Sequence, residues 1–413
     1  MWRGSPLKKV RTCRRYPHDK DSNTVSLRGC RSKDGGLSVG FGGLRICGSW
    51  HSCLTCGAKI AIYRAAILAH IFLIWQAMGN TVVLATFSAR HNRKQRLSEL
   101  VLGLRSGWKA VKSGRPWRED KANLGIAWDV RAFEGTHGDE HGWHPHYHAF
   151  FLVEGQVSQE MAEAVCWPMW QRWRAGLAEV GMTAVARVRR NGVDESAGFD
   201  VKVMNNNDYT AQDMGRYPFT MALEAVGGVF KRGRQIDAKG NLKGKRHRTP
   251  FEVMEHYAVA LAEGDQAGAE EDQRIIMEWS QTATDMRFRQ CPITKRMREF
   301  FTEKARELNI PGPLLDAEQL DDDQDIAEAE AAGTETLAHV PATDYTTTIV
   351  YEMHTLKAAA RSGFASVVAW FDQRRIPIEL TAAGEALLAE SSWMPDAART
   401  NARKPHLCTT VLT

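Results

Sequence analysis

Several features of familiar protein classes are missing from this sequence of 413 residues. Residues 1–20 are basic but contain no apolar run of the kind that a secretory signal needs, so we expect a cytoplasmic protein. There is no glycine-rich Walker loop for nucleotide phosphates, and there are no internal repeats. The most apolar stretch, residues 60–79, contains Arg64 and His70, so we predict a buried helix there and not a membrane span.

Charge is spread unevenly along a chain whose formal net charge is +5. Residues 231–248 contain eight Lys or Arg and one Asp, whereas residues 316–330 contain eight acidic residues and no base. Without the acidic run, the rest of the chain is strongly basic, which suits a polyanionic partner. The alternative is that the two runs are an ordinary solvated loop and a solvated linker.

The succession of apolar segments predicts an α+β fold. Strands are expected over residues 81–91, 123–136 and 142–155, with helices over 58–79 and 157–180. Short hairpin links in this order favour a central, mostly antiparallel sheet flanked by helices. The expected segments are a basic, Cys-rich zinc-binding segment at 1–57, a main domain at 58–255, a helical extension at 256–310, an acidic linker at 311–345 and a small C-terminal helical module at 346–413.

Residues 142–153, GWHPHYHAFFLV, place a histidine at every second position ahead of an apolar run. Alternate side chains of a β-strand face the same side, so His144, His146 and His148 are expected to converge on one face. Imidazoles at this spacing can share one divalent ion, whereas burying three of them without partners would cost several kcal/mol. Satisfied core histidines are the alternative, and the strict alternation favours a metal site.

A carboxylate is available as a further ligand. Glu134 lies in the strand expected over residues 123–136, close to the turn that leads into the histidine strand. Two imidazoles together with a carboxylate or a third imidazole leave room for a substrate oxygen on the ion. Either Glu134 or His144 can therefore complete a site with His146 and His148.

Three of the eight cysteines form a cluster near the N-terminus. The cluster has the spacing C-x5-C-x2-C at Cys47, Cys53 and Cys56. In a chain without an export signal, clustered cysteines are more often metal ligands than disulfides, and C-x2-C is the usual zinc spacing. Cys13 is favoured as the fourth ligand, with Cys30 and His51 as alternatives. Such a zinc ion would be structural, because four protein ligands leave no open position.

The ordered motifs resemble the HUH endonucleases, and in particular the replication initiators of small bacterial plasmids. The family's His-hydrophobe-His motif is matched by His146-Tyr147-His148, and LATFSARH at 84–91 resembles its upstream strand motif. DYTAQD at 208–213 stands where the family has its tyrosine helix. FKRGR, RTPFEVM and CGSWHSCLTCGAKI are also similar to parts of those initiators, so the resemblance spans roughly residues 40–290.

This resemblance implies that residues 58–255 form a domain that nicks and joins one DNA strand. Mg²⁺ or Mn²⁺ on the histidines would polarise the scissile phosphate, and Tyr209 would attack it as nucleophile. The products would be a 5′-phosphotyrosine link and a free 3′-hydroxyl that primes rolling-circle replication. The implied partners are origin DNA, single-stranded or in a hairpin at the nick site, and a host helicase and polymerase; no membrane partner is implied.

The sequence departs from the family pattern at two positions. Gln212 stands where a lysine commonly follows the tyrosine, and Asn205 where many single-tyrosine relatives have a glutamate used in termination. Both departures leave termination open, and they favour the alternative of a zinc-dependent origin-binding protein with a decayed active site. Tyr217 is the reserve nucleophile, disfavoured by the adjacent Pro218.

The basic loop next to a nicking centre is expected to bind the phosphate backbone of origin DNA. Its candidate DNA-binding residues are Lys231, Arg232, Arg234, Lys243, Lys245, Arg246 and Arg248. A relaxase or HUH transposase is a close alternative, although relaxases usually carry their tyrosine before the histidines. A His-ligated hydrolase or cupin-type enzyme would explain the histidines but neither the basic loop nor the cysteines.

Overall fold

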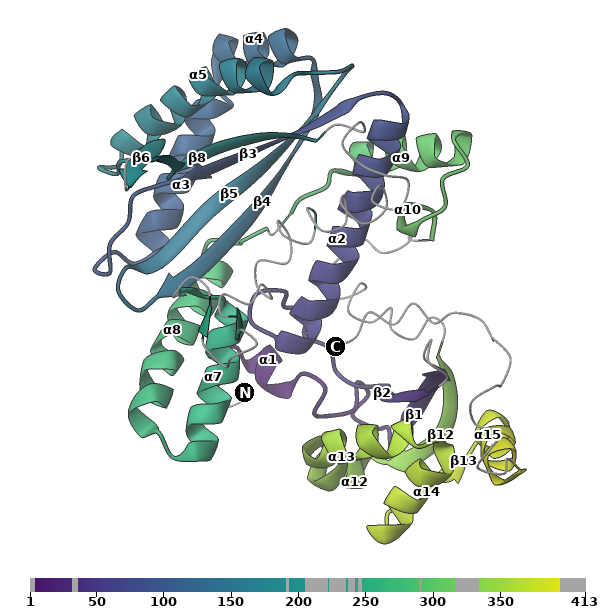
Figure 1. The fold of residues 1–413 in the computed structure, drawn as a ribbon. Helices are drawn as coiled ribbons and strands as arrows, with labels where there is room; N and C mark the ends of the chain where they lie inside the picture. Colours follow the sequence, from purple (N-terminus) through teal and green to yellow (C-terminus); the bar gives the residue numbers. More distant parts are fainter. Residues whose placement is uncertain are drawn as a thin grey trace. The chain divides into compact units, whose positions relative to one another are not determined.

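The computed structural model of the protein describes residues 4–31, 36–190, 193–204, 222, 235–236, 242–243, 247–289, 291–316 and 334–393. Contacts divide the chain into two compact units, one mainly Trp50–Leu320 and the other Leu7–Ser49 together with Asp321–Thr413. Each unit contains an antiparallel sheet with helices beside it (Figure 1), so the fold is α+β, as predicted.

The sheet of the first unit has the strand order β11-β4-β5-β3-β8, and each neighbouring pair is antiparallel. Its strands are β3 (Thr81–Ser88), β4 (Ile126–Gly138), β5 (Gly142–Val153), β8 (Phe199–Met204) and β11 (His247–Arg248). Two short hairpins accompany it, β6 (Arg187–Arg190) with β7 (Val193–Ser196), and β9 (Gln235–Ile236) with β10 (Leu242–Lys243). The strands expected from the sequence therefore form adjacent members of one sheet.

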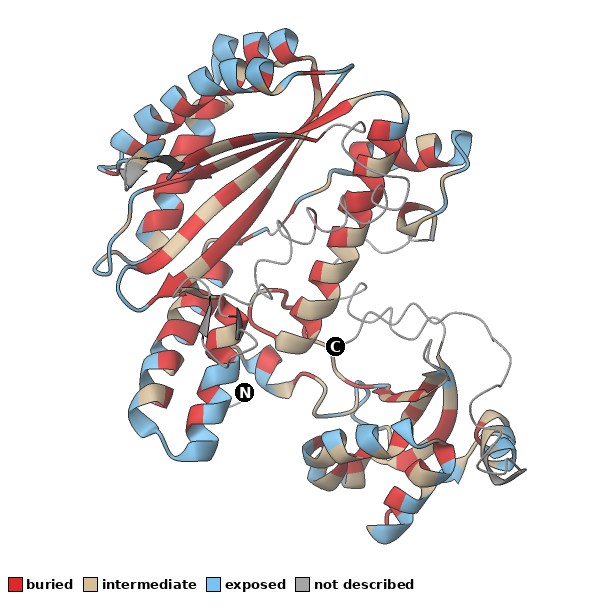
Figure 2. Ribbon diagram, in the orientation of Figure 1, coloured by how far each residue is buried: buried red, intermediate tan, exposed pale blue. Residues whose placement is uncertain are grey.

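Helices pack on both faces of this sheet. They are α2 (Leu54–Ala77) on one face, and α3 (Leu97–Val111), α4 (Gly114–Leu124) and α5 (Gln159–Ala178) on the other. The Phe72 ring of α2 lies 4.9 Å from Phe150, and Trp108 of α3 lies 6.1 Å from Tyr147. Figure 2 shows the resulting burial along β3 and the second half of β5. Coverage of both faces explains why these strands are continuous apolar runs.

Helix α2 is long and apolar enough to cross a membrane by length and composition, but 61% of its most apolar window is buried inside the protein. Its end is tied to the sheet, because Trp75 Nε1 donates to the carbonyl oxygens of Thr81 at 3.0 Å and Val153 at 3.1 Å. These contacts are those of a core helix, as predicted.

The described part of the first unit contains four further helices, α7 (Pro250–Glu263), α8 (Gln266–Asp285), α9 (Lys295–Glu307) and α10 (Pro313–Asp316). A capping box starts α7, in which Thr249 and Glu252 hydrogen-bond each other's backbone N–H groups. Trp279 of α8 stacks on Trp143 at 5.5 Å and on Phe133 at 6.1 Å. This helix therefore packs against the β4–β5 hairpin close to its turn.

The second unit contains a sheet of strand order β13-β12-β1-β2. Its elements are α1 (Lys8–Thr12), β1 (Thr24–Arg31), β2 (Leu37–Gly42), β12 (Glu335–Pro341), α12 (Ala342–Asp344), the π-helix η5 (Tyr345–Ile349), α13 (Val350–Arg361), α14 (Phe364–Gln373), β13 (Glu379–Leu380) and α15 (Ala382–Trp393). Sheet residues such as Leu27 and Val340 share one core with Leu356 and Phe371 of the helices.

The second unit joins stretches that the sequence analysis separates. Strands β1 and β2 pair with each other within the expected zinc-binding segment 1–57, and β1 also pairs with β12, which lies within the expected linker 311–345. The apolar positions of β12, Leu337 and Val340, are buried in an otherwise Thr-, Ala- and Asp-rich stretch. A strand this short shows its pattern only when its partner is known, because pairing between distant segments leaves no local signal.

Candidate metal centre

The β4–β5 hairpin brings one carboxylate and two imidazoles together. Glu134 is the register partner of His146, and His148 follows on the same face of β5. Glu134 Oε2 lies 3.2 Å from His146 Nε2 and 3.1 Å from His148 Nε2, and the two nitrogens are 3.2 Å apart. Three potential ligand atoms thus form a nearly equilateral triangle.

This triangle fits a divalent cation. Ligands that an octahedral ion holds at right angles, at about 2.1 Å, lie about 3 Å apart, close to the observed spacing. The Glu134 side chain is 4% exposed, whereas His146 and His148 are 13% and 15% exposed. Ligands on one side of an ion leave the other positions for water or a substrate oxygen. In the described part of the chain, this is one of two groups that could hold a metal ion.

Thr86 of β3 orients one of these ligands. It is the register partner of His148, and its Oγ1 lies 3.1 Å from His148 Nδ1. A hydrogen bond donated by Nδ1–H to this hydroxyl selects the tautomer whose Nε2 lone pair faces Glu134.

The charge of the carboxylate suits metal binding. Burial by itself raises the pKa of Glu134, but the imidazoles of His146 and His148 outweigh burial and hold this pKa well below its usual value. The carboxylate is therefore ionised at neutral pH, which is the form that a metal ion binds.

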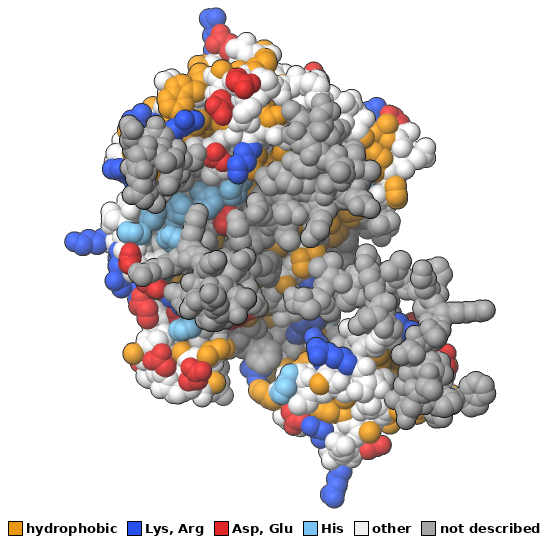
Figure 3. Space-filling view, in the orientation of Figure 1, with side chains coloured by type: hydrophobic (Ala, Val, Ile, Leu, Met, Phe, Trp, Pro, Cys, Tyr) orange, Lys and Arg blue, Asp and Glu red, His pale blue; other side chains and the backbone are white. Residues whose placement is uncertain are grey.

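His144, the third histidine of the strand, does not join this group. Its ring instead stacks on His91, with the centroids 4.8 Å apart. Burial, followed by the charges of His146 and His91, lowers the pKa of His144 to about 2, so this imidazole is neutral. Figure 3 shows that histidine side chains, in pale blue, gather on the viewed face. Of the two candidates for the third ligand, the geometry favours the carboxylate.

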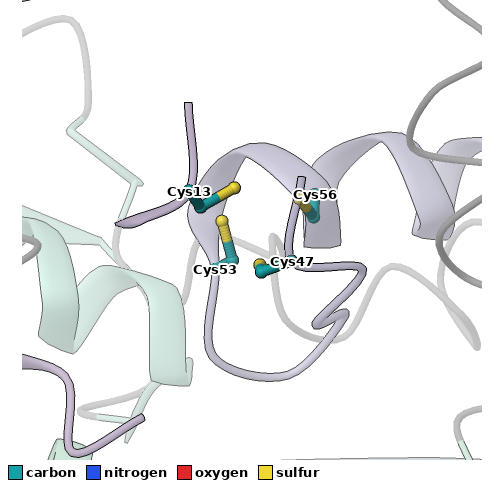
Figure 4. A group of neighbouring side chains, drawn as sticks. All are labelled: Cys13, Cys47, Cys53 and Cys56. Carbon is teal, nitrogen blue, oxygen red and sulfur yellow. The ribbon is translucent and has the colours of Figure 1, made fainter. Parts of the chain in front are cut away.

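Four buried cysteines form the second group that could hold a metal ion such as zinc. These are Cys13, Cys47, Cys53 and Cys56, whose sulfur atoms lie within 4.8 Å of one another. Figure 4 shows their side chains close together. Tetrahedral zinc with sulfur at about 2.3 Å places its ligands about 3.8 Å apart, which this group can match. Of the three candidates for the fourth position, the structure brings in Cys13, and not Cys30 or His51.

Local backbone features shape the cysteine loop. Gly48 adopts a φ of +59°, which lets the chain turn directly after Cys47, and the Ser49 N–H donates to Cys47 Sγ at 3.4 Å. Cys53 is the N-cap of α2 and Cys56 lies in the first turn of that helix. The positive end of the helix dipole favours thiolates at these positions, and a thiolate is the form that binds zinc.

The predicted nucleophile and most of the predicted DNA-binding loop lie outside the described residues. These positions are Asn205, Tyr209, Gln212, Tyr217, Lys231, Arg232, Arg234, Lys245 and Arg246, together with the side chain of Lys243. Arg248 is described, and its guanidinium pairs with the buried Asp272 at 2.6 Å and with Asp139 at 3.4 Å. The pair with Asp272 fastens β11 to α8, and the pair with Asp139 joins β11 to the turn between β4 and β5. Both compete with the predicted phosphate contact.

Two residues that contact the histidines of β5 escape the sequence analysis, Thr86 and His91. Thr86 could have been found from the sequence, because the alternation of side chains that places the histidines on one face also applies to the strand over residues 81–91. His91 follows the end of β3, so no strand periodicity places it beside His144.

The fold and the centre together define an α+β protein with a potential carboxylate–dihistidine site and a potential four-cysteine site. The chain is 32% identical over 151 residues to Protein rep of Streptomyces lividans, which covers 30% of this chain and 33% of that protein. It is 27% identical over 152 residues to Neomycin resistance protein of Streptomyces cyanogenus, covering 31% and 35%. The chain thus spans about a third of the length of these relatives. No family model and no solved structure matches the chain.

Proposed function

We propose that the protein is a plasmid replication initiator that nicks one DNA strand at the origin by metal-assisted attack of Tyr209. The observation that carries this proposal is the triangle of Glu134, His146 and His148, with edges of 3.1–3.2 Å. Similarity to Protein rep supports replication as the setting. The His146-Tyr147-His148 motif supports the HUH class within it.

The metal centre would bind Mg²⁺ or Mn²⁺, which supplies Lewis-acid stabilisation of the charge that develops on the scissile phosphate. Glu134 is buried behind the two partly exposed imidazoles, so the phosphate approaches from the side of His146 and His148. Thr86 keeps the His148 ring in position while the substrate binds.

The reaction is a transfer of the phosphoryl group from the DNA to the protein. The Tyr209 oxygen forms a bond to phosphorus and loses its proton, while the bond from phosphorus to the 3′-oxygen breaks and that oxygen gains a proton. The 5′-phosphotyrosine link retains the energy of the broken bond, so rejoining requires no nucleotide cofactor. The free 3′-hydroxyl serves as primer for a host polymerase, with a host helicase separating the strands.

The cysteine group has a structural role in this proposal. Four thiolates would close the coordination sphere of zinc and leave no position for substrate. The loop that they shape is tied to α8, because Trp279 Nε1 donates to the His51 carbonyl oxygen at 2.6 Å, and the same indole stacks on Trp143 of β5. The basic loop at residues 231–248 would hold the DNA backbone, with the single-stranded or hairpin nick site over the metal centre.

Strand cleavage with matched ligand variants tests the proposal. Single-stranded oligonucleotides tiled across the replicon are incubated with protein and with Mn²⁺ or without added divalent metal. We expect cleavage of one tile that requires the metal, that is lost in Glu134→Gln and His146→Ala, and that persists in His144→Ala. Cleavage that is indifferent to Glu134 and His146 would contradict the proposed centre, and no cleavage of any tile despite binding would indicate an origin-binding protein without nicking activity.

A further inference from the structure

A pocket borders the edge of the sheet that carries the metal centre. Three parts of the chain line it: helix α5, residues 184–187 at the start of β6, and strand β8. Among the described strands, β8 is the outer strand of the sheet, next to β3. Its volume of about 540 Å³ is in the range of about 300–1,000 Å³ that is typical of small-molecule sites. Its lining includes Trp167, Trp170, Arg174, Arg187, Phe199 and Asp200.

One wall of this pocket is an aromatic platform. Trp167 is 44% exposed, and its ring centroid lies 6.1 Å from that of Phe199. Phe199 in turn stacks on the buried Trp170, with centroids 5.2 Å apart and ring planes 23° apart. An exposed indole braced by a buried aromatic pair offers a firm surface on which a planar base can stack.

The charged groups around the platform favour an anion. Arg174 and Arg187 are exposed, and within the described part of the chain neither forms an ion pair. The pocket also holds two carboxylates: Glu163 accepts a hydrogen bond from the neutral Gln159 and keeps its charge, whereas Asp200 lies 3.5 Å from Lys202, whose ammonium offsets it. With Lys202 counted, the cationic groups outnumber the acidic ones. Two exposed guanidinium groups beside an aromatic wall are the pattern that binds a base together with its phosphate.

The backbone of β8 argues against a peptide as the occupant. The Gln159 side chain donates to the Val201 carbonyl oxygen at 2.8 Å and accepts from the Val203 N–H at 3.0 Å. These bonds occupy the outward-facing groups through which an added β-strand would pair. The edge is therefore closed to strand addition, while the side-chain pocket beside it stays open.

The sheet register connects this pocket to the metal centre. Asp200 at the pocket is the partner of Thr86, and Thr86 is the partner of His148. Adjacent strands lie about 4.8 Å apart, so β8 is about 10 Å from the strand that carries His148. Because directly paired residues share a face, Asp200 lies on the face of the metal centre, whereas Phe199, the partner of Phe87, lies on the opposite face with α5. The pocket thus borders both faces at the β8 edge, where a single strand can pass from one face to the other.

We propose that this pocket holds an unpaired nucleotide of the DNA strand that is presented to the metal centre. The base stacks on Trp167, and the phosphates on either side contact Arg174 and Arg187. The proposal rests on the proposed function, since it assigns the substrate of the nicking reaction a second point of attachment. It makes Trp167 a determinant of single-strand binding at a distance from the reacting phosphate.

Binding of single-stranded DNA without cleavage provides the test. Fluorescence anisotropy is measured with labelled oligo(dT) of about 15 nucleotides, a length in the range of single-strand binding sites. The protein carries Tyr209→Phe, and no Mg²⁺ or Mn²⁺ is added, so that binding is measured apart from chemistry. We expect Trp167→Ala to weaken binding about tenfold, the effect of losing one stacked base. Met161→Ala, which alters an exposed residue of the same helix, should have no effect.

Two further readouts separate stacking and charge from a loss of structure. Photocrosslinking with iodouracil in the oligonucleotide should label the α5 peptide that contains Trp167. Arg174→Gln combined with Arg187→Gln should reduce the slope of log affinity against log salt by about one to two, since each phosphate contact contributes about 0.7 on a single strand.

The outcomes distinguish this proposal from the proposed function. Unchanged affinity in Trp167→Ala, or crosslinks only to other peptides, would overturn the pocket even if the wild-type protein cleaves DNA. Weakened binding in Trp167→Ala with no cleavage by the wild type would uphold the pocket and overturn nicking.

Discussion

The hydroxyl of Thr86 lies 3.1 Å from Nδ1 of His148, on the opposite side of the imidazole from Glu134. This relationship means that β3 orients a ligand that β5 supplies, and that the metal centre depends on three strands and not only on the β4–β5 hairpin. An outer hydrogen bond of this kind fixes the ring and strengthens the ligand.

Replacing Thr86 should therefore weaken metal binding without touching a ligand. In Thr86→Val the side-chain shape is kept but the acceptor for Nδ1–H is lost, and we expect Mn²⁺ affinity to fall about 10- to 100-fold. Thr86→Ser keeps the hydroxyl and should bind like the wild type. Isothermal titration calorimetry with Mn²⁺ measures both, and equal affinity in the valine and serine variants would contradict the orienting role.

The cysteine group predicts the zinc content of the purified protein. Cys13→Ser should remove bound zinc and lower the midpoint temperature of thermal unfolding, because the loop from Cys47 to the start of α2 loses the metal that crosslinks it. Cys30→Ser is the matched control, since Cys30 lies in β1 outside the group. Zinc is measured by inductively coupled plasma mass spectrometry. Retention of zinc in Cys13→Ser, or its loss in Cys30→Ser, would rule out the four-cysteine site.

His137 predicts a dependence of stability on pH. Burial, with the nearby Arg248 and Arg274, lowers the pKa of His137 to about 4, whereas an unfolded histidine titrates near about 6.5. Between these values the unfolded chain binds a proton that the folded protein does not, so the free energy of unfolding falls as pH is lowered from 6.5 to 4.

Removing this imidazole should flatten the pH dependence. Between about pH 7 and pH 5, His137→Gln should reduce the loss of unfolding free energy by no more than about 2 kcal/mol. Urea denaturation at constant zinc measures this, with the exposed His141→Gln as control. An identical pH profile in His137→Gln and the wild type would refute the assignment.

The sequence predicts the central sheet well because its signals are local. Alternating histidines, the apolar run over residues 81–88 and the short turn after Gly138 each lie within one element or hairpin. The pairing of Glu134 with His146 follows from the turn, since Gly138 pairs with Gly142 and the register continues from there. A carboxylate facing the histidines was therefore predictable once the hairpin was recognised.

The sequence fails where distant segments meet. Nothing local links β1 to β12, and nothing in the spacing distinguishes Cys13 from Cys30 as the partner of the C-x2-C pair. The separation of His144 from the centre also depends on tertiary contacts, because alternation places it on the same face, and its contacts with His91 and His247 show its different surroundings. The pocket beside β8 is lined by three separate segments, so no single sequence motif predicts it.

Trapping and mapping a covalent protein–DNA adduct tests the central claim most directly. Tiled single-stranded oligonucleotides are incubated with wild type, Tyr209→Phe and Tyr217→Phe, with Mn²⁺ or without added divalent metal, and the modified peptide of any SDS-resistant adduct is located by mass spectrometry. Omitting the metal is preferable to EDTA, which would also compete with the cysteine group for zinc. The account predicts an adduct on one tile that needs Mn²⁺, persists in Tyr217→Phe, maps to Tyr209 and is absent from Tyr209→Phe. An undiminished adduct in Tyr209→Phe, or no adduct on any tile that the protein binds, would contradict it.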